Sequence, residues 1–189
     1  MVHSRAGGIA SVMAAKDADV TFVNAEVLAG SADEANDEER RKARKDNKVS
    51  AILHSGYPVR YWDADLGPAE PRLFAVEQGA EEEPGKPSTV DASAPLQLRN
   101  LTAGVGSSLR EAKTVVSPDG KTIYTSMTKA LAKADSREVL AAVDVATGTV
   151  KVLLDHEGMS YFPPGPVSPD NRTWWSRARA TRRPLRLPT

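Results

Sequence analysis

Short apolar and β-branched runs alternate with polar segments along most of the chain. Runs of this length, bounded by Gly, Pro, Asp and Ser, are typical of β-strands. They predict strands over residues 9–14, 20–28, 49–55, 72–77, 96–101, 113–116, 122–127, 139–145 and 149–154. Between the last two, Gly148 in the 146–148 turn can adopt the left-handed backbone of a tight hairpin. The pattern predicts a mainly β architecture.

One polar segment predicts a helix instead. Residues 33–48 contain six acidic and six basic side chains, with the acids first, an order that suits the helix dipole. Ser31 followed by Glu34 fits a capping box, and Asp37 and Arg41 have the spacing of an ion pair along a helix. Only alanines interrupt the charges, so we expect a solvated helix, inserted over residues 32–48, that takes no part in the core.

A turn sequence occurs twice. Ser117, Pro118, Asp119 and Gly120 are matched 51 residues later by Ser168, Pro169 and Asp170, with Asn171 in the place of the glycine. Proline favours the second position of a turn, and glycine or asparagine tolerates the positive φ that follows. One four-stranded unit fits between the two turns, and propeller blades repeat every ~40–50 residues. We interpret the repeat as a blade-turn signature; two unrelated surface turns of an ordinary β-sandwich are the alternative.

Composition excludes several classes of function. The 189 residues balance 25 basic against 25 acidic side chains, include no cysteine, and have no apolar stretch long enough to cross a membrane. Disulfides, thiolate metal sites and cysteine nucleophiles are therefore excluded, and we expect a cytoplasmic protein with no membrane partner. Residues 171–189 contain six arginines and no acid. Arginine with tryptophan can bind single-stranded nucleic acid, but the neutral remainder of the chain argues against a nucleic-acid partner.

Several segments resemble one enzyme family. They are residues 19–26, the charged helix, 50–53, 57–63 and 66–68, and the likeness continues through 100–102, 115–122 and 142–154. These segments resemble the N-terminal β-propeller of actinobacterial peptidases of the prolyl oligopeptidase family, in its dipeptidyl-aminopeptidase and acylaminoacyl-peptidase branch. The resemblance covers roughly residues 9–173, with 57–63 the most specific part. It implies a propeller that caps a C-terminal α/β-hydrolase domain and restricts which peptides reach the catalytic serine.

The catalytic elements of that family do not occur in the sequence. There is no Gly-x-Ser-x-Gly elbow, so we assign no catalytic residue and expect this chain to be inactive alone, although its parent family consists of serine-type hydrolases. A triad built from unrelated positions is the alternative, which a fluorophosphonate probe would detect. His156 lies between two acids, but neighbouring strand residues point to opposite faces, so no metal or cofactor is predicted.

Four residues are candidate substrate-channel contacts. Arg60 and Trp62 project to one side of an extended segment, where they can line a channel or simply stack inside a blade. Glu38 and Glu39 form an acidic pair on the helix, and dipeptidyl-peptidase relatives use paired glutamates to hold the free amino group of a substrate. Basic residues follow this pair closely, which favours a solvated helix face.

The sequence therefore predicts an all-β fold, a partial (incomplete) β-propeller of about two to three blades over residues 1–173 with one inserted charged helix. The unit at 113–154 would be a complete blade, following a decorated one and preceding a broken one. At the positions of Trp174 and Trp175 the family has valines. Two GTG valine codons read one base late become two TGG tryptophan codons. We therefore interpret residues 174–189 as an aberrant, frameshifted Arg-rich tail.

The expected function is that of the non-catalytic, substrate-gating propeller portion of a serine peptidase whose catalytic domain is missing from this chain. A peptide substrate is then a partner only in the full-length enzyme. Unpaired edge strands could also cause self-association through open blade edges. The alternative function is a freestanding binding or scaffold module that assembles its blades with other chains.

Overall fold

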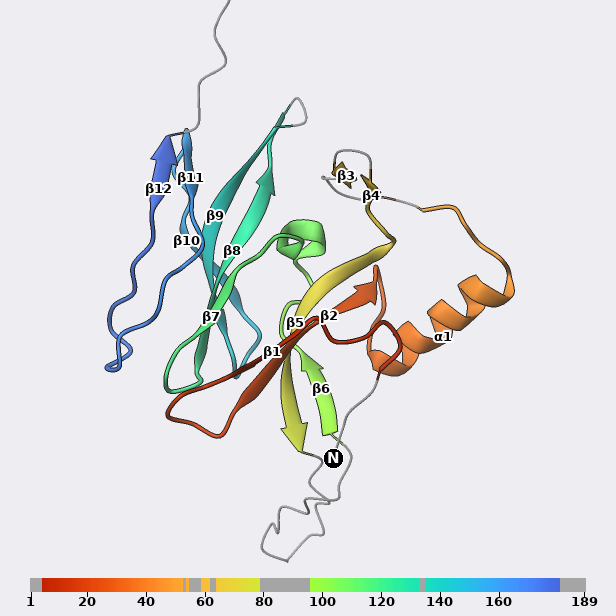
Figure 1. Cartoon of the computed structure of the whole chain (residues 1–189), viewed down its shortest axis with the longest axis horizontal. Coiled ribbons are helices and arrows are strands. Elements are labelled where there is room, and N and C mark those ends of the chain that lie inside the picture. The colour runs from red at the N-terminus through yellow and green to blue at the C-terminus, as the bar shows by residue number, and fades with distance from the viewer. Residues whose placement is uncertain are drawn as a thin grey trace, which may run out of the picture.

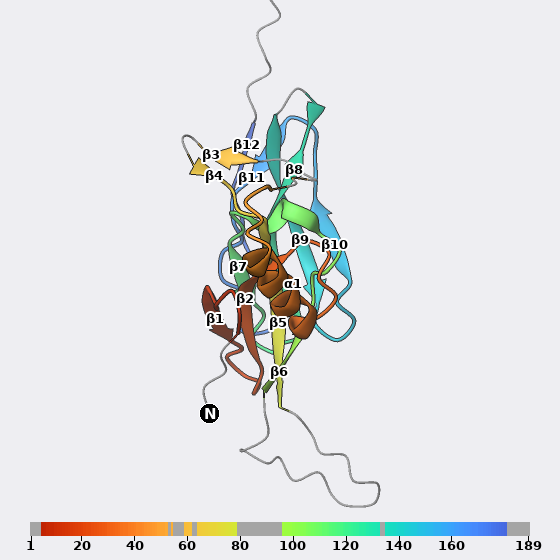
Figure 2. The same ribbon diagram turned by 90° about the vertical axis from the view of Figure 1, so that its right-hand side faces the viewer.

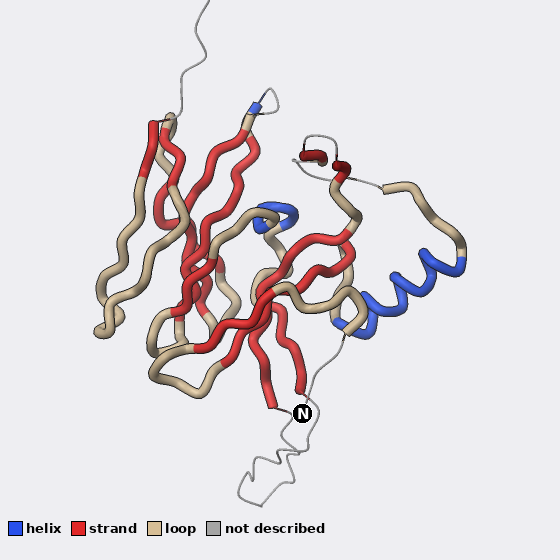
Figure 3. Tube along the Cα trace, in the orientation of Figure 1, coloured by secondary structure: helices blue, strands red, loops and turns tan. Residues whose placement is uncertain are grey.

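The computed structural model describes residues 5–52, 54, 59–61, 64–78, 96–132 and 135–180. These residues form mostly antiparallel β-sheet with one α-helix and one short 3₁₀ helix, in agreement with the all-β prediction (Figures 1 and 3). No helix in this described part is long and apolar enough to cross a membrane.

The first sheet has four antiparallel strands in the order β1-β2-β5-β6. Its strands are β1 (Ser11–Ala14), β2 (Thr21–Leu28), β5 (Ala69–Gln78) and β6 (Leu96–Asn100). Between β2 and β5 the chain forms α1 (Glu34–Asp46) and a small hairpin of β3 (Arg60–Tyr61) and β4 (Ala64–Asp65). The sheet is therefore built from strands that neighbour one another in chain order, with the helix as an insertion.

The second sheet repeats this arrangement. A 3₁₀ helix, η1 (Gly106–Leu109), leads into β7 (Thr114–Val116), β8 (Thr122–Ala130), β9 (Ser136–Asp144) and β10 (Val150–Leu154), which pair in chain order. The chain then forms β11 (Met159–Tyr161), which pairs with β12 (Ala178–Ala180), and a single bridge joins Val167 to Trp174. We call residues 159–180 the third hairpin, which lies beside the second sheet (Figure 1).

The main core lies between the first and second sheets. Because side chains alternate along a strand, the same face of β2 and β5 that presents Phe22 and Leu73 meets the face of β8 and β9 that presents Ile123 and Val143. These four side chains are at most 1% exposed. Each large apolar side chain buried in this way stabilises the fold by about 1.5–3 kcal/mol. Leu101 and Leu109, from the connection between the sheets, close the same cluster.

The opposite face of the first sheet is also apolar. Val23, Ala25, Val27 and Phe74 form a second buried cluster there. Val12, which pairs with Val23 and so lies on this face, is 65% exposed. A sheet with apolar residues on both faces is typical of one that is covered on both sides.

One predicted strand does not form. Over the described residues of 49–55, the backbone is irregular, while 53 and 55 lie outside the described residues. The segment follows the end of α1, where Arg44 donates hydrogen bonds to the carbonyl oxygens of Val49 (3.4 Å) and Ala51 (2.9 Å). Since β2 pairs directly with β5 along its whole length, the sheet has no place for a strand between them.

The helix is anchored by a buried charge, which the pattern of charges did not predict. Asp37 is 0% exposed. Its carboxylate accepts hydrogen bonds from the backbone N–H of Leu28 (2.7 Å), from Arg5 (2.9 Å) and from Arg41 (2.9 Å). The expected Asp37–Arg41 pair is present and no residue of α1 belongs to the apolar clusters, as predicted, but the burial of Asp37 was not expected. Figure 2 shows α1 lying in front of the first sheet.

The predicted cap of this helix is also wrong. Asp33 is the N-cap, and its side chain accepts a hydrogen bond from the backbone N–H of Asn36 at 2.8 Å. Ser31 donates its hydroxyl hydrogen to Asp37 at 3.4 Å, and it lies outside the helix. Both Asp33 and Ser31 are good capping residues, and the buried position of Asp37 decides between them because it sets where the first turn starts.

We expect Asp37→Ala to lower the free energy of unfolding by about 3 kcal/mol, because the buried Arg5 would lose its 2.9 Å partner and keep only the longer ion pair with Glu34 at 3.5 Å. The side chain of Arg5 is 1% exposed. Urea unfolding followed by circular dichroism measures the loss. Glu38→Ala is the matched control, since Glu38 is exposed on the same helix and should change stability by less than about 0.5 kcal/mol. Equal stability of the two variants would contradict the anchoring role of Asp37.

Candidate functional site

The first of the two repeated turns is held by a dense set of hydrogen bonds. The Ser117 hydroxyl donates to Asp119 (2.7 Å) and accepts from the backbone N–H of Thr122 (3.0 Å). The Asp119 carboxylate also accepts from the N–H of Lys121 at 3.1 Å. The hydrogen bond from Ser117 is the main reason that the pKa of Asp119 lies below its ordinary value. Gly120 has a φ of 71°, as the turn sequence predicts.

The second turn makes the same bonds with its own residues. Ser168 donates to Asp170 and accepts from Thr173 at 3.0 Å, and Asp170 accepts from the N–H of Arg172 at 3.1 Å. Asn171 takes the left-handed position of the glycine with a φ of 58°. The hydroxyl of Ser168 is likewise the main cause of a lowered pKa for Asp170. The sequence repeat is therefore also a repeat of local structure.

The two turns touch each other and a third turn. The side-chain oxygen of Asn171 accepts a hydrogen bond from the N–H of Asp119 at 3.2 Å. On the other side, the carbonyl of Pro118 accepts from the N–H of Asp17 at 2.8 Å. Asp17 lies in the β1–β2 turn, where the N–H of Ala15 donates a hydrogen bond to the carbonyl of Val20. The N–H of Ser117 donates to the carbonyl of Thr122 with the same spacing of five residues.

This third turn carries no copy of the repeated Ser-Pro-Asp sequence, so the repeat did not predict it. Ala15 stands where the repeated turns have serine, and no proline or glycine follows it within the turn. Asp17 is the one residue that matches the repeated turn sequence. We call the three turns, at residues 15–20, 117–122 and 168–173, the turn stack. Ser117 and Gly120 are buried in its middle, whereas Asp170 at its end is exposed.

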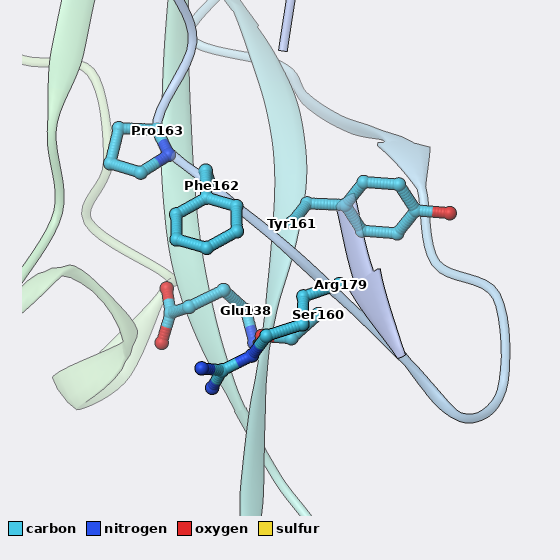
Figure 4. Close-up of a pocket in the computed structure, with 6 residues that line it drawn as sticks. All are labelled: Glu138, Ser160, Tyr161, Phe162, Pro163 and Arg179. Atoms are coloured by element: carbon cyan, nitrogen blue, oxygen red, sulfur yellow. The ribbon is translucent and has the colours of Figure 1, made fainter. Parts of the chain in front are cut away.

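A cavity of about 160 Å³ lies between the second sheet and the third hairpin. Its lining residues are Glu138 of β9, Ser160 and Tyr161 of β11, Phe162, Pro163 and Arg179 of β12 (Figure 4). The Ser160 hydroxyl accepts a hydrogen bond from the backbone N–H of Glu138 at 3.0 Å, which ties the hairpin to the sheet. In Figure 4 the Tyr161 ring points away from the other lining side chains.

Glu138 is the unusual group of this cavity. It is half-buried, and its carboxylate accepts a hydrogen bond from Thr128 at 2.8 Å. Burial raises the pKa of Glu138 above its ordinary value, and the nearby carboxylate of Glu111 adds to the rise. No sequence signal pointed to it, because a single acid at the start of an apolar strand is normally solvated.

A charged network lies on the end of β8 and β9 near β11. Asp155 forms ion pairs with Lys129 at 2.5 Å and with Arg137, and the hydrogen bond from Lys129 is the main cause of its lowered pKa. Arg137 also donates to the carbonyl of His156, whose ring contacts the Tyr161 hydroxyl. Two cations and one anion thus hold the 155–161 connection onto the sheet. No cluster of acids and histidines in the described residues is suited to a metal ion.

Three of the four candidate channel residues lie in the described part of the chain, and Arg60 is not close to Glu38 and Glu39. Arg60 is exposed in the β3–β4 hairpin, and Trp62 lies outside the described residues. Glu38 and Glu39 are exposed on α1, which stands apart from that hairpin in both ribbon views (Figures 1 and 2). The residues of the repeated turn, by contrast, lie side by side in the turn stack.

We expect Gly120→Ala to lower the free energy of unfolding by about 2 kcal/mol, because a left-handed backbone costs a residue with a Cβ about 1–2 kcal/mol. A Cβ at this position would also come within 3.2 Å of Ala15 and 3.3 Å of Val20 in the neighbouring turn. Thermal unfolding measures the effect. Gly104→Ala is the control, since a Cβ there meets no atom within 4 Å. If both variants unfold at the same temperature, the turn stack contributes little.

Glu138→Gln should make the chain more stable at pH 7 but not at pH 4. The folded-state pKa of Glu138 is raised above its ordinary value of 4.5, so its contribution to stability is full below pH 4.5 and is lost as the pH rises through the folded-state pKa. Glutamine imitates the protonated form. Chemical unfolding at the two pH values tests this, with the exposed Glu157→Gln as control. A gain at pH 4 as large as that at pH 7 would refute it.

The chain was also compared with known proteins. No family model, curated protein or solved structure matches it. The similarity that remains is an internal one, between the repeated turns of this chain at residues 117–122 and 168–173.

Proposed function

We propose that this chain forms consecutive blades of an incomplete β-propeller, and that the propeller is the non-catalytic, substrate-gating part of a serine peptidase of the prolyl oligopeptidase type. The turn stack is the observation that carries the first half of this proposal. Two turns 51 residues apart have the same hydrogen bonds and are joined by the contact between Asp119 and Asn171. Units that repeat in chain order and contact one another at equivalent positions are what a propeller requires.

The order of the strands supports a propeller over a sandwich. In a Greek-key sandwich the chain passes between two sheets before either is complete. In this chain four strands pair in sequence, and the next unit packs its face on the finished sheet. The third hairpin continues the series, because its turn is equivalent to the one between β7 and β8.

The gating role rests on the resemblance of the sequence segments to the peptidase family. The most specific of them, residues 57–63, falls largely outside the described residues. Since the sequence has no Gly-x-Ser-x-Gly elbow, the proposal assigns peptide hydrolysis to an α/β-hydrolase domain encoded outside these 189 residues. A chain without cysteine also suits the cytoplasm, where we propose that the enzyme works.

The proposal is tested by sequencing the gene beyond codon 189. We expect a coding region for an α/β-hydrolase with a Gly-x-Ser-x-Gly elbow, either in frame or in a neighbouring frame joined by a shift near codon 174. A locus with no such region in any frame would overturn the peptidase assignment. Labelling of this chain itself by a fluorophosphonate probe would overturn the non-catalytic part.

The second candidate function is a freestanding binding or scaffold module that assembles with other chains. Two exposed apolar side chains favour it: Val12 on the outer face of the first sheet is 65% exposed, and Trp175 of the third hairpin is 54% exposed. Size-exclusion chromatography with circular dichroism separates the two candidates. A discrete, cooperatively unfolding oligomer supports the module, whereas an aggregate or an unfolded monomer supports a part of a larger enzyme.

A further inference from the structure

The cavity beside Glu138 has the composition of a binding site for a small molecule. It lies where the third hairpin meets the second sheet, and it is formed by residues from three separate segments. Its volume of about 160 Å³ is below the ~300–1,000 Å³ of pockets for drug-sized ligands. The cavity therefore suits a ligand that is smaller than a drug-sized molecule.

One end of the cavity carries a negative charge that the described residues do not neutralise. The carboxylate of Glu138 receives one hydrogen bond, from the neutral hydroxyl of Thr128. No ion pair involves it among those of the described residues. Glu111 adds a second negative charge nearby. A half-buried carboxylate in this position favours a positively charged partner.

The cavity also contains a positive charge. Arg179 of β12 contributes to its lining, and its guanidinium lies on the same side as the Glu138 carboxylate in Figure 4. The two groups form no ion pair with each other within the described structure. The ring of Phe162 and the side chain of Pro163 lie on the other side of the Glu138 carboxylate from Arg179 in Figure 4. The lining thus combines a carboxylate, a guanidinium and an apolar wall.

We propose that this cavity binds a free α-amino acid with an aliphatic side chain. The ammonium group of such a ligand would donate hydrogen bonds to Glu138, and its carboxylate would accept them from Arg179. The aliphatic side chain would pack on Phe162 and Pro163, which are both exposed in the structure, and would cover part of their apolar surface. A zwitterion satisfies both charged groups at once, which a simple amine or a simple acid cannot do. This inference does not depend on the proposed peptidase function, but it takes Arg179 as a native part of the fold, in contrast to the frameshift interpretation of residues 174–189.

Three related compounds test the proposal on the intact chain. They are L-leucine, 3-methylbutylamine, which lacks the carboxylate, and 4-methylpentanoate, which lacks the ammonium. Binding is followed by NMR, through the chemical shifts of the backbone N–H of Glu138 and Ser160. We expect leucine to bind and each analogue to bind at least about tenfold more weakly, since a hydrogen-bonded charge contributes about that factor. Equal binding of leucine and either analogue would overturn the zwitterion assignment.

Two variants and a control complete the test. Glu138→Gln should weaken the binding of leucine at least about tenfold and leave the binding of 4-methylpentanoate unchanged. Arg179→Gln should also weaken the binding of leucine at least about tenfold, but leave the binding of 3-methylbutylamine unchanged. Glu157→Gln is the control, because Glu157 is exposed and does not line the cavity. If leucine causes no saturable shift in the wild-type chain, the cavity is not a ligand site, and closure of Arg179 onto Glu138 replaces the proposal. The comparison of compounds on the wild-type chain remains decisive even if a variant fails to fold.

Discussion

The structure depends on one apolar layer that two sheets share. Phe22 and Leu73 of the first sheet and Ile123 and Val143 of the second are removed from water only because the sheets lie face to face. Neither sheet could bury this face alone, and a small antiparallel sheet with an exposed apolar face is marginally stable. Two other features border this contact: the turn stack lies at one end of the layer, and the 101–109 connection closes its side.

Polar groups decide how the remaining elements attach to this layer. The helix α1 has no apolar face, so it is held by the buried carboxylate of Asp37, which Arg5 and the N–H of Leu28 satisfy. The third hairpin is held by the hydrogen bond from the backbone N–H of Glu138 to the Ser160 hydroxyl. The connection that leads into it is held by the ion pairs of Asp155 with Lys129 and Arg137. Polar contacts of this kind form only between matched donors and acceptors, so the surfaces around them need not pack closely. The cavity at Glu138 lies at this attachment.

The proposed propeller and the proposed amino-acid site belong to different parts of the same arrangement. The turn stack joins successive units through the backbone N–H groups of Asp17 and Asp119, which donate to the carbonyl of Pro118 and to the side chain of Asn171. The cavity lies in the same interface between units, but it is lined by side chains that could change without affecting the turns. A repeating scaffold of this kind allows the packing between units to support the fold and its gaps to bind ligands.

The sequence by itself determined the strands of the two four-stranded sheets, the hairpin at Gly148 and the conformation of the repeated turns at Gly120 and Asn171. These depend on the alternation of neighbouring side chains and on the φ that a residue tolerates, both of which are local. Only the tertiary structure decided that Asp37 is buried, that residues 15–20 complete the turn stack, that residues 49–52 form no strand and that Glu138 lines a cavity. Each of these is set by a partner far away in the chain, such as Arg5 for Asp37 and Ser160 for Glu138, and no local pattern records such a pairing.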